Sequence, residues 1–290
     1  MLTVSNIIKK VRALEIKSKR LTSNIFSGEY HSAFKGRGMS FKEVREYAAG
    51  DDIRFIDWNT SARFGHPFSK IFEEERELTV MLLLDWSASN LGGTHQQQKK
   101  ELIIEMAAVL AFSAISNNDK VGAVFFTGQT EFFIPPKKGK EHVLYIVRQM
   151  LSIEPVSSST NISEAIRFFN QTLRNKGIVF LLSDFETKDY SKALRTVARR
   201  HDCIAIHVHD QIEFNFPDAG LVPMQDAETG QLIWVDTSDV QFRRRWQKMH
   251  EKHLEETKTT IHQSGWDYLR FQTGEDYVKT LQGFFIQRIK

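Results

Sequence analysis

Five oxygen-bearing side chains stand where buried strands should end or a helix should begin. They are Asp85, Ser87, Ser89, Thr160 and Asp184. Carboxylate and hydroxyl oxygens are hard ligands, and Mg²⁺ binds about six oxygen atoms, some of them from water. Two carboxylates and three hydroxyls would suit Mg²⁺ or Mn²⁺ without a nitrogen or sulfur ligand. The sequence therefore predicts a divalent-cation site, provided that the fold brings these segments together.

The elements that would position these residues follow from the spacing of the apolar side chains. Residues 78–84 and 178–183 are short continuous apolar runs, which are typical of strands buried on both faces. Further strands are expected at 121–126, 203–208 and 266–271, with helices between them. This alternation predicts a mostly parallel, doubly wound, Rossmann-like α/β sheet. Ligands bind beyond the carboxyl ends of such strands, where both carboxylates fall.

The character of the chain changes at about residue 77. Residues 1–77, with a basic start and a glycine-punctuated stretch, are expected to form an N-terminal extension with loops. Residues 78–290 are expected to form one domain, with a hairpin insertion near 211–236. Because the apolar side chains of residues 34–77 need a surface to cover, we expect that stretch to pack onto the domain.

Composition excludes several classes of protein. Of the 290 residues, 41% are hydrophobic and 26% are charged, which excludes a disordered chain and a coiled coil. The chain has one cysteine, which rules out an internal disulfide and a cysteine-rich zinc cluster. No window approaches the roughly 20 apolar residues of a transmembrane helix, and a cytoplasmic location is expected.

The five oxygen-bearing residues resemble the metal-ion-dependent adhesion site of von Willebrand factor A domains. In that family Asp-X-Ser-X-Ser follows the first strand, a Thr precedes a helix in mid-domain, and an Asp ends a later strand. The resemblance implies that Ser87, Ser89 and Thr160 supply hydroxyl ligands, whereas Asp85 and Asp184 bind largely through metal-held water. It also implies an electrophilic cation that gains from an Asp or Glu of a partner protein.

A second set of motifs precedes the expected sheet. It comprises Gly36-Arg-Gly-Met-Ser-Phe41, Arg45-Glu-Tyr47, Gly50-Asp-Asp-Ile-Arg54, Ile56-Asp-Trp58, Ser61-Ala-Arg63 and Phe72-Glu-Glu-Glu-Arg76. These motifs resemble the signature of the domain of unknown function 58 (DUF58) family, whose members carry a von Willebrand factor A-like domain behind this segment. The resemblance implies a MoxR-type AAA+ ATPase as a partner. Many members have transmembrane helices ahead of the signature, but this chain has none, so membrane attachment is not expected.

The signature mixes charged and aromatic side chains, which permits two interpretations. Arginine–carboxylate pairs and rings would clamp the extension to the sheet domain through bidentate hydrogen bonds. Alternatively, Arg54, Asp57, Trp58 and Arg63 form a binding surface for the ATPase.

Histidines and the cysteine carry weaker signals. His250 and His253 are spaced for one helix face, but no third zinc ligand follows, so a solvated face is expected. His207 and His209 alternate at a strand end and are not assigned as ligands. Cys203 lies among isoleucines and is expected in the core.

Three functional hypotheses remain. The first is a non-enzymatic, metal-dependent protein-interaction module, an adaptor or chaperone component that works with the ATPase. A metal-dependent phosphoester hydrolase would also use carboxylates as Mg²⁺ ligands, but no general base is evident. A nucleic-acid binder is suggested by Arg243, Arg244 and Arg245, which point in different directions on a helix. We expect the first, and neither an enzyme nor a nucleic-acid partner.

Overall fold

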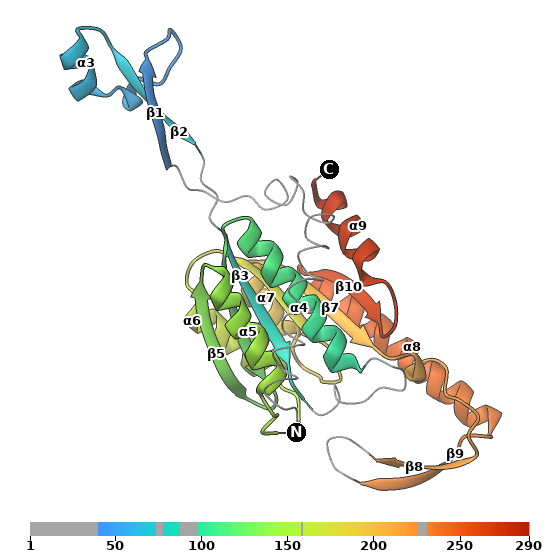
Figure 1. The fold of residues 1–290 in the computed structure, drawn as a ribbon. Helices are drawn as coiled ribbons and strands as arrows, with labels where there is room; N and C mark the ends of the chain where they lie inside the picture. Colours follow the sequence, from blue (N-terminus) through green and yellow to red (C-terminus); the bar gives the residue numbers. More distant parts are fainter. Residues whose placement is uncertain (1–39, 74–77, 88–97, 158, 226–230, 290) are drawn as a thin grey trace.

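A six-stranded sheet forms the centre of the structure (Figure 1). The computed structural model describes residues 40–73, 78–87, 98–157, 159–225 and 231–289. The strands of the sheet are β3 (Thr79–Asp85), β4 (Lys120–Phe126), β5 (Thr130–Lys137), β6 (Ile178–Ser183), β7 (Asp202–His209) and β10 (Asp267–Gln272). All neighbouring pairs are parallel except the antiparallel pair β4 and β5.

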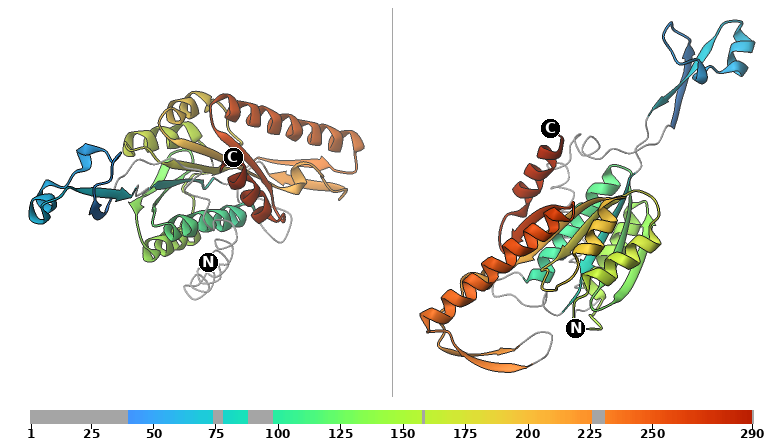
Figure 2. Two further views of the ribbon diagram at one scale, coloured as in Figure 1. Left: turned by 90° about the horizontal axis from the view of Figure 1, so that it is seen from above. Right: turned by 180° about the vertical axis from the view of Figure 1, so that it is seen from behind.

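Both faces of the sheet are covered by helices, as the left view of Figure 2 shows. One layer contains α4 (Lys99–Ser116), α5 (Lys140–Ser152) and α9 (Tyr277–Ile289), and the other contains α6 (Ile162–Thr172), α7 (Ser191–Ala198) and α8 (Val240–Gln263). In β3, Leu82 and Leu84 belong to the first core layer, whereas Met81 and Leu83 belong to the second. This alternation explains the continuous apolar run, because both faces of the strand are buried. No helix in the described ranges is long and apolar enough to cross a bilayer.

The order of the strands defines where a ligand can bind. Read from the β5 edge, the order across the sheet is β5-β4-β3-β6-β7-β10, which is 3-2-1-4-5-6 when the strands are counted along the chain from β3. This confirms the doubly wound, mostly parallel sheet expected from the sequence. The winding reverses between β3 and β6, and the carboxyl ends of the strands at such a switch point form the usual binding crevice.

A hairpin interrupts the domain after β7. The 3₁₀ helix η3 (Gln211–Glu213) follows β7 directly, and β8 (Leu221–Gln225) then pairs with β9 (Leu232–Asp236). Figure 1 and the right view of Figure 2 place this hairpin near the start of α8, away from the sheet. It lies in the stretch where the sequence predicts an insertion, and its Trp234 is 64% exposed.

Part of the N-terminal stretch forms a small arm of its own. This arm consists of β1 (Ser40–Glu46), η1 (Ile53–Phe55), α3 (Trp58–Phe64) and β2 (Phe68–Glu73), with β1 and β2 antiparallel. It extends away from the sheet domain in every view (Figures 1 and 2). For the described residues, the expectation that residues 34–77 pack onto the domain is therefore wrong.

The ion pairs of the arm explain why it can stand apart. Three pairs join a Lys or Arg to an aspartate, namely Arg45 with Asp51 (2.8 Å), Arg54 with Asp52 (2.6 Å) and Lys70 with Asp57 (3.7 Å), and His66 lies 3.2 Å from Glu46. All of these contacts lie within the arm, so they fix its turns and do not clamp it to the sheet. The sequence predicts only loops here, because short strands without a buried face show no clear periodicity.

Gly122 in β4 is a point of close approach between strands. A Cβ atom at this position would lie 2.7 Å from Met81 Sδ and 2.8 Å from the carbonyl oxygen of Ile134. We expect Gly122→Ala to lower the free energy of unfolding by about 1–3 kcal/mol, because a tightly packed core resists overpacking. Gly283→Ala in α9 is the control, since a Cβ there meets nothing within 4 Å. Urea unfolding of both variants tests this, and wild-type stability of Gly122→Ala would contradict it.

Candidate cation-binding site

Two aspartates lie at the switch point of the sheet. Asp85 is the last residue of β3, and Asp184 directly follows the last residue of β6. These strands are parallel neighbours, with Leu84 of β3 opposite Leu182 of β6. Both carboxylates are nearly inaccessible, with exposures of 1% for Asp85 and 2% for Asp184. The structure thus brings the two predicted carboxylates to one edge of the sheet.

Hydrogen bonds hold the carboxylate of Asp85 in place. Its Oδ2 accepts a hydrogen bond from Ser183 Oγ at 2.5 Å, and its Oδ1 accepts one from the backbone N–H of Ser87 at 3.0 Å. Burial, followed by the negative charge of Asp184, raises the pKa of Asp85 to about 7. The two carboxylates therefore disfavour each other's ionisation, and a cation between them would relieve that repulsion.

Thr160 is brought to the same edge by the segments on either side of it. Asn161 donates its backbone N–H to the carbonyl of Thr127, just beyond β4, at 2.8 Å. Thr187, in the segment after β6, donates its hydroxyl to the carbonyl of Thr160 at 3.2 Å. The Thr160 hydroxyl itself is buried and has no hydrogen-bond partner among the described residues. A buried hydroxyl without a partner is unusual and is free to bind a ligand.

The oxygen-bearing side chains at this edge are of the type that a hard cation binds. They comprise the carboxylates of Asp85 and Asp184 and the hydroxyls of Ser87 and Thr160, while Ser89 lies outside the described residues. In the part of the chain that the structure describes, no three or more His, Cys, Asp or Glu residues are arranged to hold a metal ion. A cation at this edge would therefore depend on hydroxyl and water oxygens, which is the donor set that the sequence predicts.

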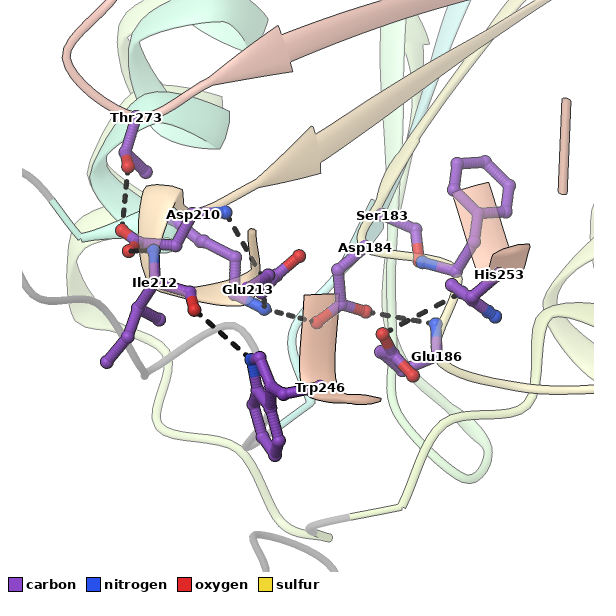
Figure 3. A network of polar contacts seen from close by, with 11 residues as sticks. Ser183, Asp184, Glu186, Asp210, Ile212, Glu213, Trp246, His253 and Thr273 are labelled. Atoms are coloured by element: carbon purple, nitrogen blue, oxygen red, sulfur yellow. Dashed lines mark hydrogen bonds and ion pairs between the residues drawn. The ribbon is translucent and has the colours of Figure 1, made fainter. Parts of the chain in front are cut away.

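Asp184 also has a partner that the sequence analysis missed. The Nζ atom of Lys99 lies 2.9 Å from Asp184 Oδ2 and 3.2 Å from Glu213 Oε1. Figure 3 shows Asp184 and Glu213 in this network. Burial acts to lower the pKa of Lys99, but the charges of Asp184 and Glu213 outweigh burial and raise it, so the ammonium stays charged. The signal in the sequence was the position of Lys99 in the first turn of α4. The helix macrodipole disfavours a positive charge there, so a lysine at this position indicates a nearby negative partner.

The backbone is strained immediately after Asp184. Phe185 is fully buried and has a φ of 56°, in the left-handed region that bulky residues avoid. Its N–H donates to Ser183 Oγ at 2.9 Å, which helps to hold this conformation. Strain of this kind clusters at binding sites, where the surrounding structure enforces it.

Four histidines lie close to this edge, between β7 and α8. The ring of His207 lies 6.1 Å from that of His209 and 6.4 Å from that of His253. His250 packs on Trp246 at 4.7 Å, and His253 is only 30% exposed. The expected solvated face for His250 and His253 is therefore wrong, because α8 turns this face towards the sheet. Cys203 is buried in the core, as expected.

The buried histidines predict a stability that depends on pH. Burial lowers the pKa of His201 to about 4, and neither of its ring nitrogens has a hydrogen-bond partner within the described part of the chain. Burial similarly lowers the pKa of His207, His209 and His250. A lowered pKa in the folded state gives stability that is present above about pH 6.5 and is lost as pH falls towards 4.

We therefore expect the free energy of unfolding to decrease between about pH 6.5 and pH 4. The variant His201→Leu should lose less stability over this range than the wild-type protein, because it removes one group that takes up a proton on unfolding. His201 packs on Phe169 in the second core layer, away from the sheet edge. Urea unfolding at several pH values measures the difference, and identical pH dependence in the two proteins would contradict the assignment.

The four predicted partner-binding residues of the arm have different environments. Arg54 pairs with Asp52. Asp57 caps α3, because its carboxylate accepts hydrogen bonds from the backbone N–H groups of Asn59 at 3.1 Å and Thr60 at 3.2 Å. Asp57 thus has a structural role. Trp58 is 71% exposed and Arg63 is also exposed, so these two remain available to a partner.

Comparisons with known proteins agree with this architecture. A family model described as "Protein of unknown function DUF58" matches residues 43–256. Uncharacterized proteins of Mycobacterium bovis and Mycobacterium tuberculosis are 28% identical over 281 residues, which is 96% of this chain and 88% of theirs. A crystal structure of an aerotolerance-related membrane protein from Bacteroides fragilis aligns with a TM-score of 0.52 at 19% identity. The alignment covers 73% of this chain and 98% of that chain, and shows a shared fold.

Proposed function

The chain belongs to the DUF58 family, and we propose that it is a non-enzymatic protein-interaction module that binds a partner through a divalent cation. In this proposal Asp85, Ser87, Ser89, Thr160 and Asp184 hold Mg²⁺ or Mn²⁺. The observation that carries the proposal is the pair of buried aspartates at the switch point of the sheet, at the same edge as the Thr160 hydroxyl, which has no hydrogen-bond partner among the described residues. The von Willebrand factor A-like order of the strands supports it.

The chemistry of the donors determines what such a site can do. Hydroxyl oxygens are neutral, so they leave a bound cation electron-deficient and able to accept a carboxylate. Ser183 and the N–H of Ser87 orient the carboxylate of Asp85, while the bonds that flank Thr160 fix its hydroxyl at the edge. The partner is therefore expected to supply an Asp or Glu side chain.

We further propose that the partner is a MoxR-type AAA+ ATPase and that the complex forms in the cytoplasm. The resemblance of the signature motifs to those of the family supports this choice. The arm offers a second contact surface, because three large apolar side chains on it are exposed: Ile53, Trp58 and Phe64. Because the arm joins the domain at the amino end of β3, this surface lies on the opposite side of the domain from the sheet edge, and a single partner would have to reach around the domain to contact both (Figure 1).

The experiment that tests the proposal is a pull-down of the candidate ATPase by this protein. Capture is expected with about 5–10 mM Mg²⁺, which is roughly 5 to 100 times the dissociation constants of weak oxygen-ligated cation sites, and is expected to fail in EDTA. Restoring Mg²⁺ after EDTA should restore capture. Equal capture with and without EDTA would refute a cation-bridged contact.

A further inference from the structure

Lys99 is a buried lysine in contact with a carboxylate of the proposed cation site. It is the first residue of α4 and is 6% exposed. Its two ion-pair partners, Asp184 and Glu213, come from different elements, one after β6 and one in η3. Because a buried ammonium is stable only when carboxylates pair with it, these two residues account for its position.

Glu213 is held in place from several directions. Its carboxylate accepts the backbone N–H of Asp210 at 3.2 Å in a capping box. Asp210 in turn accepts hydrogen bonds from the N–H of Ile212 at 3.0 Å and from the hydroxyl of Thr273 at 2.7 Å. Trp246 of α8 donates to the carbonyl of Ile212, as Figure 3 shows. The fold thus builds a second, fixed carboxylate for Lys99 next to Asp184.

We propose that Lys99 is the resting counter-ion of this site and competes with the divalent cation for Asp184. The inference rests on the proposed function, since it concerns the same cation. The ammonium donates a hydrogen bond to Asp184 Oδ2, and its positive charge repels a second cation at short range in a medium of low dielectric constant. Binding of the divalent cation requires Lys99 to leave Asp184, and Glu213 is placed to keep it paired.

Because of this competition, the wild-type protein binds the divalent cation more weakly than the same oxygen donors would bind it without the Lys99 ammonium. The competition also couples the site to two elements that do not belong to the donor set, the start of α4 and η3. Any partner that draws Lys99 towards Glu213 strengthens cation binding, and any partner that returns it to Asp184 weakens binding. Lys99 is therefore the residue through which the affinity of the site is adjusted.

The test compares Lys99→Met with Lys100→Met by calorimetric titration with Mn²⁺. Methionine keeps an unbranched side chain that is one atom shorter and removes the charge. Lys100 is the matched control, because its ammonium lies 4.8 Å from the ring of Trp86 and not on Asp184. We expect Lys99→Met to bind Mn²⁺ at least tenfold more tightly than the wild-type protein, and Lys100→Met to bind it with wild-type affinity.

A second variant covers the case in which Lys99→Met fails to fold with Glu213 unpaired. Lys99→Met/Glu213→Gln removes the buried pair together, and the same tenfold gain is expected. Wild-type affinity in the folded variants would overturn the role of Lys99 and leave the proposed function intact. No Mn²⁺ binding by the wild-type protein or any variant would overturn both, whereas binding that appears only without Lys99 would support the competition and overturn the proposed function of the wild-type protein.

Discussion

The double variant Asp85→Ala/Ser87→Ala is expected to lose the stabilisation that Mn²⁺ gives to the wild-type protein. A ligand at about 100 times its dissociation constant stabilises the folded state by about 2.7 kcal/mol, provided that it binds only that state. Asp85 is one of the two carboxylates of the proposed donor set, and the N–H of Ser87 donates to it. Removing both side chains should reduce the Mn²⁺-dependent gain to near zero in urea or thermal unfolding.

A matched control for this variant exists in the same chain. Asp236 and Ser238 repeat the Asp-X-Ser spacing on the exposed side of the domain, and Ser238 donates both its N–H and its hydroxyl to Asp236. Asp236→Ala/Ser238→Ala should therefore keep the full response to Mn²⁺. If the folded Asp85→Ala/Ser87→Ala protein also kept it, the cation would have to bind elsewhere.

The second large effect is expected in the affinity of this protein for the proposed ATPase partner. Thr160→Ala is expected to weaken binding to the ATPase by about 2 kcal/mol or more, roughly thirtyfold in the dissociation constant, because a carboxylate on a metal can act as a hot spot. The change removes a hydroxyl without a hydrogen-bond partner among the described residues, so the fold should tolerate it. Asp184→Ala should weaken the complex similarly, but it also breaks the pair with Lys99, and its fold must be verified by circular dichroism.

Thr130→Ala is the control for the loss of a threonine hydroxyl. The Thr130 hydroxyl is also buried without a hydrogen-bond partner in the described structure, but Thr130 begins β5 opposite Phe126 and is therefore two strands away from Asp85. We expect wild-type affinity for this variant, measured by the same titration with the ATPase. A complex indifferent to Thr160→Ala, Asp184→Ala and EDTA would place the contact elsewhere, with the arm around residues 54–63 as the next surface to test.

The sheet and its two aspartates could be predicted because their signals are local. Continuous apolar runs such as residues 178–183 identify strands buried on both faces, and the residue after each run falls at the carboxyl end. Strands that alternate with helices along the chain form a parallel sheet, and a parallel sheet brings Asp85 and Asp184 to one edge. The convergence of this part of the site therefore follows from the fold class.

The contacts around Asp184 could not be predicted, because they join residues far apart in sequence. Lys99 and Glu213 are separated by 114 positions, and each alone resembles an ordinary surface residue. The arm was missed for a different reason: its strands have no buried apolar side chain among the residues whose burial is described, so no apolar period identifies them. The environment of His250 depends on the angle at which α8 lies on the domain, and helical spacing does not specify that angle.

The most direct test of the proposed cation site is the position of manganese in a crystal of the wild-type protein grown with Mn²⁺. Anomalous scattering is expected to show one Mn²⁺ at the carboxyl ends of β3 and β6, with the hydroxyls of Ser87 and Thr160 about 2.0–2.3 Å from it. Asp85 and Asp184 should contact it largely through bound water. The assignment of the site would be contradicted if saturating Mn²⁺ gave no anomalous peak at this edge. It would also be contradicted if Lys99 still paired with Asp184 and the metal lay elsewhere.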